Sequence, residues 1–449
     1  MNATRLPPGS RTPGAVNAVQ FTRDPVGFLE RQWHRYGDAF SINFPGFGRM
    51  AYFAAPDTVK EIFTGDPGAL HAGEANARVL EPALGKFSLL TLDEGDHMRQ
   101  RKLLLPPFHG ERVRRYRELI TGIAEREIDR WPTGSPMPLR PRMQAITLEV
   151  ILRAVFGVRG EDRLARFRAT LPQLTEASGV VMWLPFMRHN FGPWSPWARF
   201  QRMRRAVDAL VYEEIRLRRA DPDMEERDDV LSLLLQARHE DGSPMTDEEL
   251  RDELITLLTA GHETSATALA WTFERLLRTP HALARLLGDL DDEPYLDAVV
   301  KETLRVRPVV IDVARVAKRD VEIGGWAIPA ETIVVPAIAL VQLRPDLYPE
   351  PQEFRPERFL GEDQPPAYSW IPFGGGVRRC IGAAFAQVEV KTVLRAVLEK
   401  VRLAAPDPAP ERQRSRHVTL VPSRDAMVVV ERRLASPDNR DAPLLSTRA

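Results

Sequence analysis

The chain contains one cysteine, Cys380, which lies in the glycine- and arginine-rich segment FGGGVRRCIG. A single cysteine cannot form an intramolecular disulfide, so its side chain is a free thiol, a nucleophilic thiolate, a metal ligand or a buried structural group. The surrounding glycines let the backbone adopt unusual dihedral angles and approach a flat ligand closely. Arg378 and Arg379 stand beside Cys380, and a helical pattern begins at Ala383. Both features favour the thiolate over the thiol.

A second group of reactive side chains is the sequence AGHETS at residues 260–265, within a longer helical pattern. A glycine followed by an acid and hydroxyls lowers the local helix propensity and invites a widened turn that could hold a small ligand. Glu263 and Thr264 could then pass protons to that ligand. The alternative is that Glu263 faces solvent and Thr264 bonds back to a backbone carbonyl.

Two charged pairs at helical spacing form a third group. Glu302 and Arg305 lie three residues apart, and an exposed pair of this kind stabilises a helix by only about 0.2–0.5 kcal/mol. If the pair is buried it needs a further partner, and Arg358 in the segment FRPERF is a candidate. His97 and Arg101 lie four apart and offer two donors of the kind that carboxylates accept. A solvated surface face is the alternative for both pairs.

These residues must be positioned by a mainly helical fold with a minor β-sheet. Apolar or small residues recur at helical spacing from Asp247 to Leu276, which predicts one helix of about 30 residues and roughly 45 Å through the centre of the fold. A second helix over residues 295–305 is stopped by Pro308. Short strands are expected over 313–316, 321–323 and 332–335.

The bulk composition excludes several classes of protein. A formal net charge of zero gives no global argument for nucleic acid or an anionic membrane as partner. The N-terminal residues lack the apolar core of a signal peptide, and no apolar run approaches the roughly 20 residues of a membrane span. No linker or repeat divides the sequence. We therefore expect a soluble, cytoplasmic monomer with a single domain over residues 1–449 and loosely ordered tails at about 1–20 and 435–449.

In order and combination, these motifs resemble the cytochrome P-450 family of haem-thiolate enzymes over nearly the whole chain. The family's haem-binding signature is matched by Phe373, Gly376, Arg378, Cys380 and Gly382. Its oxygen-groove motif is matched by Ala260, Gly261, Glu263 and Thr264. Its Glu-x-x-Arg motif, with the partner arginine, is matched by Glu302, Arg305 and Arg358.

The resemblance implies the cytochrome P-450 fold, with haem b (iron protoporphyrin IX) between the long central helix and the cysteine loop. Cys380 would supply the axial thiolate, which favours O–O cleavage in this family. The two haem propionates would be held by His97, Arg101, Arg315 and Arg378. Thr264 would stabilise the bound oxygen through hydrogen bonds, and Glu263 would relay protons. Glu302, Arg305 and Arg358 would then form a buried structural triad.

The reaction that this family implies is insertion of one oxygen atom from O2 into a C–H or C=C bond of a hydrophobic small molecule, such as a fatty acid, terpenoid, steroid or polyketide. By family position, the walls of the substrate pocket include Val180, Val181, Val309, Val310, Ile311 and Leu420. Asp312 could meet a polar group on the substrate or face solvent.

Electrons would come from a separate ferredoxin or flavodoxin with its NAD(P)H reductase, as in soluble bacterial members. Arg379, Lys391 and the basic run at residues 99–117 could form a docking face for this acidic partner. A peroxide-driven peroxygenase is an alternative, but it would not need the proton relay of Glu263 and Thr264. A thiolate-haem sensor or electron carrier is another, although no signalling or DNA-binding module is visible.

Overall fold

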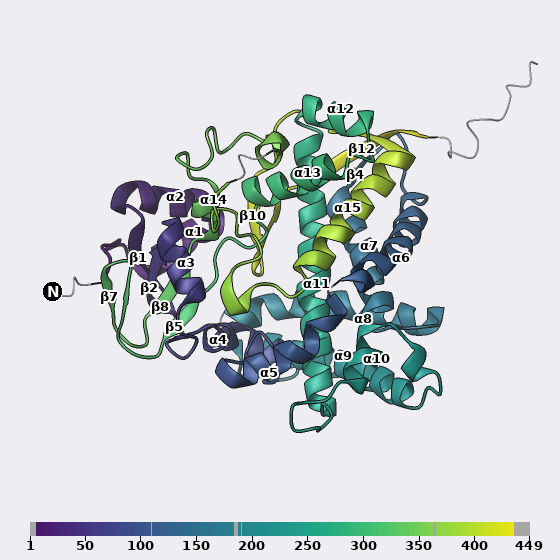
Figure 1. The fold of residues 1–449 in the computed structure, drawn as a ribbon, viewed down its shortest axis with the longest axis horizontal. Coiled ribbons are helices and arrows are strands. Elements are labelled where there is room, and N and C mark those ends of the chain that lie inside the picture. The colour runs from purple at the N-terminus through teal and green to yellow at the C-terminus, as the bar shows by residue number, and fades with distance from the viewer. Residues whose placement is uncertain (1–5, 109, 184–186, 190, 362–364, 435–449) are drawn as a thin grey trace, which may run out of the picture.

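The computed structural model describes residues 6–108, 110–183, 187–189, 191–361 and 365–434. Helices form most of this part of the chain, as the sequence predicts (Figure 1). They are α1 (Gly14–Arg23), α2 (Pro25–Tyr36), α3 (Pro56–Thr64), α4 (Ala72–Leu84), α5 (Glu94–Leu104), α6 (Glu111–Ile128), α7 (Leu139–Ala154), α8 (Glu161–Trp183), α9 (Pro196–Arg219), α10 (Val230–Gln236), α11 (Asp247–Leu276), α12 (Pro280–Gly288), α13 (Glu293–Val306), α14 (Ile338–Gln342) and α15 (Ala383–Lys400).

The strands form one five-stranded sheet and three small ones. The large sheet has the order β1-β2-β8-β5-β3, in which β2 and β8 are parallel and the other neighbours antiparallel. Its strands are β1 (Ala39–Phe44), β2 (Gly48–Phe53), β3 (Leu70–His71), β5 (Arg315–Ala317) and β8 (Ile333–Pro336). The smaller sheets pair β6 (Val321–Ile323) with β7 (Trp326–Ile328), β10 (Gln413–Arg416) with β11 (Thr419–Pro422), and β12 (Met427–Arg433) with both β4 (Pro136–Pro138) and β9 (Val401–Ala404).

Helix α11 is the central element, and its 30 residues match the predicted length. It begins with a capping box, in which Thr246 and Glu249 satisfy each other's backbone amides. Three acids in its first turn also suit the positive end of the helix dipole. Residues on all sides of the helix are buried, because α7, α15, α9 and α13 pack around it. The helix therefore forms a rigid axis for any site built on it (Figure 1).

The N-terminal residues are more ordered than the sequence predicts. Residues 6–20 were expected in a loose tail, but Ser41 of β1 donates from its backbone amide to the Pro8 carbonyl at 2.7 Å and from its hydroxyl to the Pro7 carbonyl at 2.7 Å. Residues from Gly14 onward then form α1, where Asn17 donates to the Asn43 carbonyl at 3.1 Å. Proline lacks an amide donor, but its carbonyl still accepts, and this pairing ties the segment to the sheet. The predicted tail at residues 435–449 lies outside the described residues.

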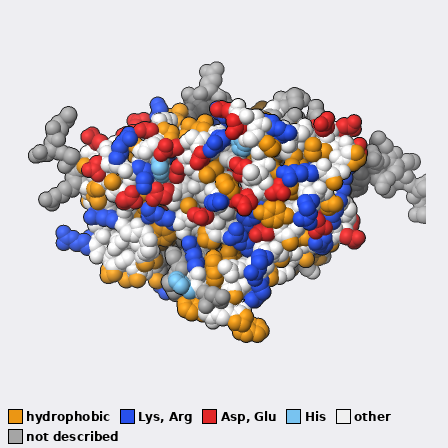
Figure 2. Space-filling model, turned by 90° about the horizontal axis from the view of Figure 1, so that it is seen from below, with side chains coloured by type: hydrophobic (Ala, Val, Ile, Leu, Met, Phe, Trp, Pro, Cys, Tyr) orange, Lys and Arg blue, Asp and Glu red, His pale blue; other side chains and the backbone are white. Residues whose placement is uncertain are grey.

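The surface agrees with the zero net charge of the chain. Figure 2 shows Lys and Arg side chains interspersed with Asp and Glu over one face of the molecule, with scattered hydrophobic side chains between them. Within the described residues, no helix combines the length and hydropathy that crossing a membrane requires.

Candidate active site

The cysteine loop precedes α15 and is shaped by its own backbone. The amide of Cys380 donates to the Phe373 carbonyl at 3.0 Å, which closes the loop. Gly376 has a φ of +61°, and a Cβ atom there would lie 1.8 Å from the Phe63 carbonyl oxygen at the end of α3. Only glycine fits this position, so Gly376 fixes the loop against α3. Gly382 is the residue before α15, and a Cβ on it would lie 3.9 Å from the sulfur of Cys380.

The thiol of Cys380 keeps accessible surface among densely packed neighbours. Protein atoms enclose it closely enough that burial raises its pKa, yet the residue keeps accessible surface. The Gly382 amide and the charges of Arg101 and Arg379 lower the pKa, but burial outweighs them. The sequence features that favour a thiolate are therefore present but insufficient alone. A bound metal cation would supply the missing stabilisation, since coordination deprotonates a thiol.

The middle of α11 also keeps accessible surface. Thr259 and Ala260 keep accessible surface, although the turns on both sides of them are largely buried. The hydroxyl of Thr264 donates to the Ala260 carbonyl at 2.5 Å. The widened turn expected here is not formed, because α-helical structure continues through residues 260–265 and Thr264 bonds within the helix. Gly261 allows close packing on α7, since a Cβ there would lie 2.8 Å from Ile151 Cδ1.

Glu263 lies in a buried ion-pair cluster and does not face solvent. Arg140 of α7 donates to Glu263 Oε1 at 3.2 Å, and Gln144 of α7 donates to Oε2. Arg416, at the end of β10, brings its Nε to 3.7 Å from Oε1. These partners come from elements more than 100 residues away in either direction, and no local pattern in the sequence points to them. Sequence reasoning therefore identified the acid but missed the residues that hold it.

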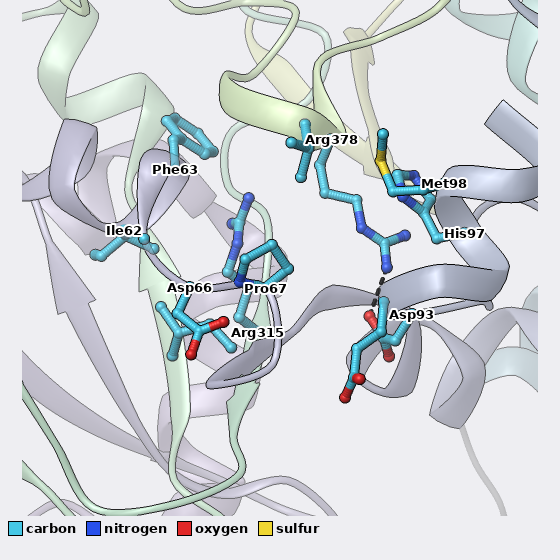
Figure 3. Close-up of a pocket in the computed structure, with 13 residues that line it drawn as sticks. Ile62, Phe63, Asp66, Pro67, Asp93, His97, Met98, Arg315 and Arg378 are labelled. Carbon is cyan, nitrogen blue, oxygen red and sulfur yellow. Dashed lines mark hydrogen bonds and ion pairs between the residues drawn. The ribbon is translucent and has the colours of Figure 1, made fainter. Parts of the chain in front are cut away.

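Three predicted cofactor ligands converge at one edge of the site. His97 of α5, Arg315 of β5 and Arg378 of the cysteine loop line one pocket, which Figure 3 shows. Arg378 pairs with Asp93 at 2.5 Å and donates to the Leu92 carbonyl and, at 3.2 Å, to the Leu89 carbonyl. Burial, with the charges of Arg378 and Arg101, lowers the pKa of His97 to about 3, so this imidazole is neutral near pH 7.

Arg101 occupies a different position from the other three. Its guanidinium donates to the Arg379 carbonyl at 2.8 Å, the peptide bond just before Cys380. It therefore reaches the sulfur side of the loop, where its charge acts on the cysteine. The structure brings His97, Arg315 and Arg378 together and places Arg101 beside them at the thiol.

The buried donors fit the haem that the resemblance implies. Arg315 lies over the ring of Phe63 at 4.8 Å, and its Nη1 is buried without a hydrogen-bond partner among the described residues. Burial and the charge of Arg378 lower its pKa to about 10, so it stays protonated at neutral pH. An unpaired buried guanidinium nitrogen is costly, and a carboxylate such as a propionate would satisfy it. An accessible thiol and a set of donors that can bind carboxylates are what a haem needs.

The third predicted group forms a compact buried cluster. Arg305 donates to both oxygens of Glu302 at 2.7 Å, and neither side chain has accessible surface. Arg358 brings its Nε to 3.3 Å from Glu302 Oε1, and the Arg355 amide donates to the same oxygen at 2.8 Å. Arg305 also donates to three backbone carbonyls, those of Gln342, Pro351 and Glu353. The surface-pair alternative for Glu302 and Arg305 is therefore wrong.

The predicted pocket-wall residues lie in several environments. Val309 and Ile311 are buried beside β5, and Val310 is partly exposed. Leu420 is buried and donates its amide to the Val309 carbonyl at 2.9 Å, which ties the β10–β11 hairpin to this wall. Val181 is buried in the main core cluster. The side chain of Val180 lies outside the described part of the chain.

Asp312 is an enclosed acid next to this wall. The Tyr52 hydroxyl of β2 donates to its carboxylate and lowers its pKa, but burial dominates and raises that pKa to about 6. Asp312 nevertheless keeps part of its surface accessible, so both alternatives for this residue stay predictions.

Comparison with known proteins gives one consistent result. The model of the Cytochrome P450 family matches residues 6–430 of this chain. Cytochrome P450 135B1 of Mycobacterium tuberculosis is 44% identical over 446 residues, which cover 95% of this chain and 91% of that protein. Cytochrome P450 135A1 of the same species is 38% identical over 447 residues, with 98% and 99% covered. The retinoic-acid-bound cyanobacterial CYP120A1 superposes with a TM-score of 0.84 at 24% identity, covering 96% of this chain and all of that one.

Proposed function

The chain belongs to the cytochrome P450 family and is a P450 monooxygenase, and we propose that it uses O2 to oxidise a hydrophobic small molecule with Cys380 as the axial haem ligand. The observation that carries this proposal is the thiol of Cys380, which keeps accessible surface although protein atoms around it raise its pKa by burial. Because Cys380 is the only cysteine, no other residue of the chain can supply a thiolate.

Haem with a thiolate ligand supplies the oxygen-activating chemistry, because the thiolate pushes electron density onto the iron and favours O–O cleavage. The residues around it bind and orient that group. His97, Arg315 and Arg378 would hold the propionates, and the unpaired Nη1 of Arg315 supports this role. Arg101 would set the electrostatics at the sulfur through the Arg379 carbonyl.

Two side chains of α11 would manage protons. The hydroxyl of Thr264 donates to the Ala260 carbonyl, at the point where the helix keeps accessible surface. Glu263 would exchange protons with solvent through its cluster, since Arg416 is about one-third exposed while Arg140 is buried. The cluster of Glu302, Arg305 and Arg358 would only stabilise the fold. Glu302 has no accessible surface, and its carboxylate oxygens are already occupied by its partners.

A hydrophobic substrate is supported by the apolar side chains of Val309 and Ile311 at the expected pocket wall. It also agrees with the retinoic acid bound to CYP120A1, which has the same fold. The classes that we propose are fatty acids, terpenoids, steroids and polyketides. Asp312 and Tyr52 would meet a polar group on such a molecule.

We further propose a cytoplasmic monomer that receives electrons from a ferredoxin or flavodoxin and an NAD(P)H reductase. Arg379, an exposed basic residue beside Cys380, supports docking of an acidic carrier there. Lys391 of α15 does not, because it is largely buried and paired with Glu293 and Asp297. A peroxygenase is less well supported, because the chain has both Glu263 and Thr264, and a peroxygenase would not need their proton relay.

The test begins with a screen of hydrophobic compounds against the purified holoenzyme, read by the shift in haem spin state. Compounds that shift the spectrum are then incubated with NADPH, a surrogate ferredoxin system and ¹⁸O2. A monooxygenase transfers one labelled oxygen atom to the product. Product formed from peroxide but not from O2 would support the peroxygenase, and no oxidation under either condition would contradict the proposal.

A further inference from the structure

Asp93 stands directly before α5, at the position where an aspartate normally caps its own helix. Its side chain makes no such bond. It accepts instead from the amides of Gly73 and Glu74 in the first turn of α4, at 2.8 and 2.7 Å. The carboxylate therefore caps the N-terminus of a different helix, whose own N-cap residue, His71, makes no side-chain cap bond.

The same carboxylate also binds the cysteine loop. Arg378 pairs with Asp93 Oδ1 at 2.5 Å, which is the interaction marked by a dashed line in Figure 3. Only 16% of each of these two side chains is exposed, so solvent and salt screen the pair less than they would screen a surface pair. Asp93 thus joins α4, α5 and the cysteine loop at one point.

Gly73 allows the acid to reach α4. A Cβ atom on this residue would lie 2.2 Å from the Leu92 carbonyl oxygen and 2.8 Å from Asp93 Oδ2. Any larger residue would push the two segments apart. Arg378 donates to the same Leu92 carbonyl, so this stretch of backbone is held by α4 on one side and by the cysteine loop on the other.

The two arginines at this edge of the site are therefore not equivalent. Arg378 is occupied by protein acceptors, namely the Asp93 carboxylate and two backbone carbonyls. Arg315 has its Nη1 buried without a partner among the described residues. A carboxylate ligand gains most from the arginine whose donor is unused, because that nitrogen otherwise stays buried and unpaired.

The segment that Arg378 holds continues to the central helix. The Phe87 amide donates to Asp252 of α11 at 3.0 Å. The Thr256 hydroxyl of the same helix donates to the Ser88 hydroxyl at 2.6 Å. Residues 85–93 are thus fixed to α11 at one end and to the cysteine loop at the other.

We propose that Asp93 is a positioning residue that keeps Arg378 as a clamp between the cysteine loop and residues 89–93, and leaves the larger share of propionate binding to Arg315. This inference rests on the proposed haem site. Asp93 also adds a negative charge at the propionate edge, and a negative charge opposes reduction of a nearby metal ion. The alternative is that Arg378 serves chiefly the propionates, with Asp93 competing for it.

The first measurement is the rate of haem transfer from the ferric holoenzyme to excess apomyoglobin. Asp93→Asn keeps the shape of the side chain and removes its charge, and should speed transfer about threefold or more, because the clamp loses its ion pair. Competition would give the opposite sign, since Arg378 would be freed for the propionates. Arg315→Met should speed transfer more than either Asp93→Asn or Arg378→Met.

The double variant Asp93→Asn/Arg378→Met tests whether the two residues act as a unit. A clamp predicts that it releases haem no faster than Arg378→Met alone, because the shared interaction is lost only once. Effects that multiply would show that the two residues act independently.

The reduction potential separates this role from a general effect on folding. Asp93→Asn should raise the midpoint potential of the holoenzyme. Asp93→Glu keeps the charge and should restore the potential toward the wild-type value, while still speeding haem transfer to a smaller extent. Asp66→Asn is the matched control, because Asp66 lines the same pocket but is 54% exposed and paired with Arg319. It should keep the wild-type potential and transfer rate.

Slower or unchanged haem transfer from Asp93→Asn, independent effects in the double variant, or an unchanged potential would each overturn the proposal. The reduced carbon monoxide spectrum of the same samples keeps this test apart from the proposed function. A red-shifted Soret band in the wild type, with unchanged transfer from Asp93→Asn, would reject the clamp and leave the thiolate assignment standing. A haem-loaded wild type without that band would reject the thiolate assignment, whereas faster transfer from Asp93→Asn would still support the clamp.

Discussion

Glu302 and Glu263 are both buried glutamates paired with arginines, but their clusters are built differently. Glu302 has no accessible surface, and Arg305 contacts both of its oxygens at 2.7 Å. Glu263 is contacted at 3.2 Å by Arg140 and at 3.7 Å by Arg416, whose side chain is about one-third exposed. One cluster is saturated and closed, and the other keeps a loose contact that reaches the surface.

We propose that this difference separates a structural role for Glu302 from a functional role for Glu263. A saturated buried ion pair holds chain segments together, and changing its protonation would be costly. A carboxylate whose partner is partly exposed and contacts it at a longer distance can change partners at lower cost. A proton relay requires such changes. The same two residue types therefore support different roles, and geometry decides between them.

The largest effect is expected from breaking the closed cluster. Arg305→Met leaves Glu302 buried with its main partner removed, and should lower the free energy of unfolding by about 3–5 kcal/mol. Urea denaturation of the holoenzyme measures this loss. Arg319→Met removes an exposed pair with Asp66 and should change stability by less than about 1 kcal/mol. Equal effects of the two variants would show that the Glu302 cluster carries no special stability.

Glu389 is a third buried glutamate, and among the described residues no arginine is paired with it, so pH extends the comparison. Burial raises the pKa of Glu389 from 4.5 to about 8, and Ser265 offsets this only in part. The folded state therefore holds a proton that the unfolded state releases. The resulting stability is complete below about pH 4.5 and is lost as pH rises through about 8, by up to about 1.4 kcal/mol per pH unit.

Glu389→Gln should flatten this slope, because glutamine does not titrate. Unfolding free energies measured by urea at several pH values across the window give the slope directly. Glu431→Gln, an exposed change on β12, should keep the wild-type slope. A wild-type slope in the Glu389 variant would assign the pH dependence to other groups.

The open cluster should affect turnover more than folding. Glu263→Gln keeps the shape of the side chain and removes its charge, so product formation should fall about tenfold or more while the protein still folds. The ratio of product to NADPH consumed, with a compound found by the spin-state screen, measures this effect. Glu248→Gln, exposed in the first turn of the same helix, should keep the wild-type ratio. An unchanged ratio in the Glu263 variant would remove this residue from the relay.

The smallest effect is expected at the exposed end of the open cluster. Arg416→Gln removes the contact at 3.7 Å, which is worth at most about 1 kcal/mol because the pair is partly exposed. We expect a change of up to about fivefold in turnover and a shifted pH profile, with stability nearly unchanged. Arg414→Gln, exposed on the same strand, is the matched control. A stability loss as large as that of Arg305→Met would make the two clusters equivalent.

The sequence alone predicts the frame of this molecule well. The pattern of α11 is strong enough to give its 30-residue length, because apolar or small residues recur at helical spacing along all of it. The mainly helical fold and the short strands near residues 315–335 follow from similar local signals. The ordered residues 6–20 were missed, because their stability comes from Ser41 and Asn43, which are distant in sequence.

The site was only partly predictable for the same reason. Motif spacing identified Cys380, Glu263 and Glu302, since each lies in a recognisable local pattern. The partners Arg140 and Arg416 could not be found, because they meet Glu263 only after α7 and the β10–β11 hairpin pack on α11. Spacing also could not show that burial raises the pKa of Cys380.

The most direct test of the central claim is the reduced carbon monoxide spectrum of the holoenzyme and of Cys380→Ser. Since the chain has one cysteine, a thiolate signature can arise only from Cys380. We predict a strongly red-shifted Soret band in the wild type, and its loss in the variant even where haem is still bound. A red-shifted band that survives in Cys380→Ser, or that is absent from the haem-loaded wild type, would contradict the assignment of Cys380 as the axial ligand.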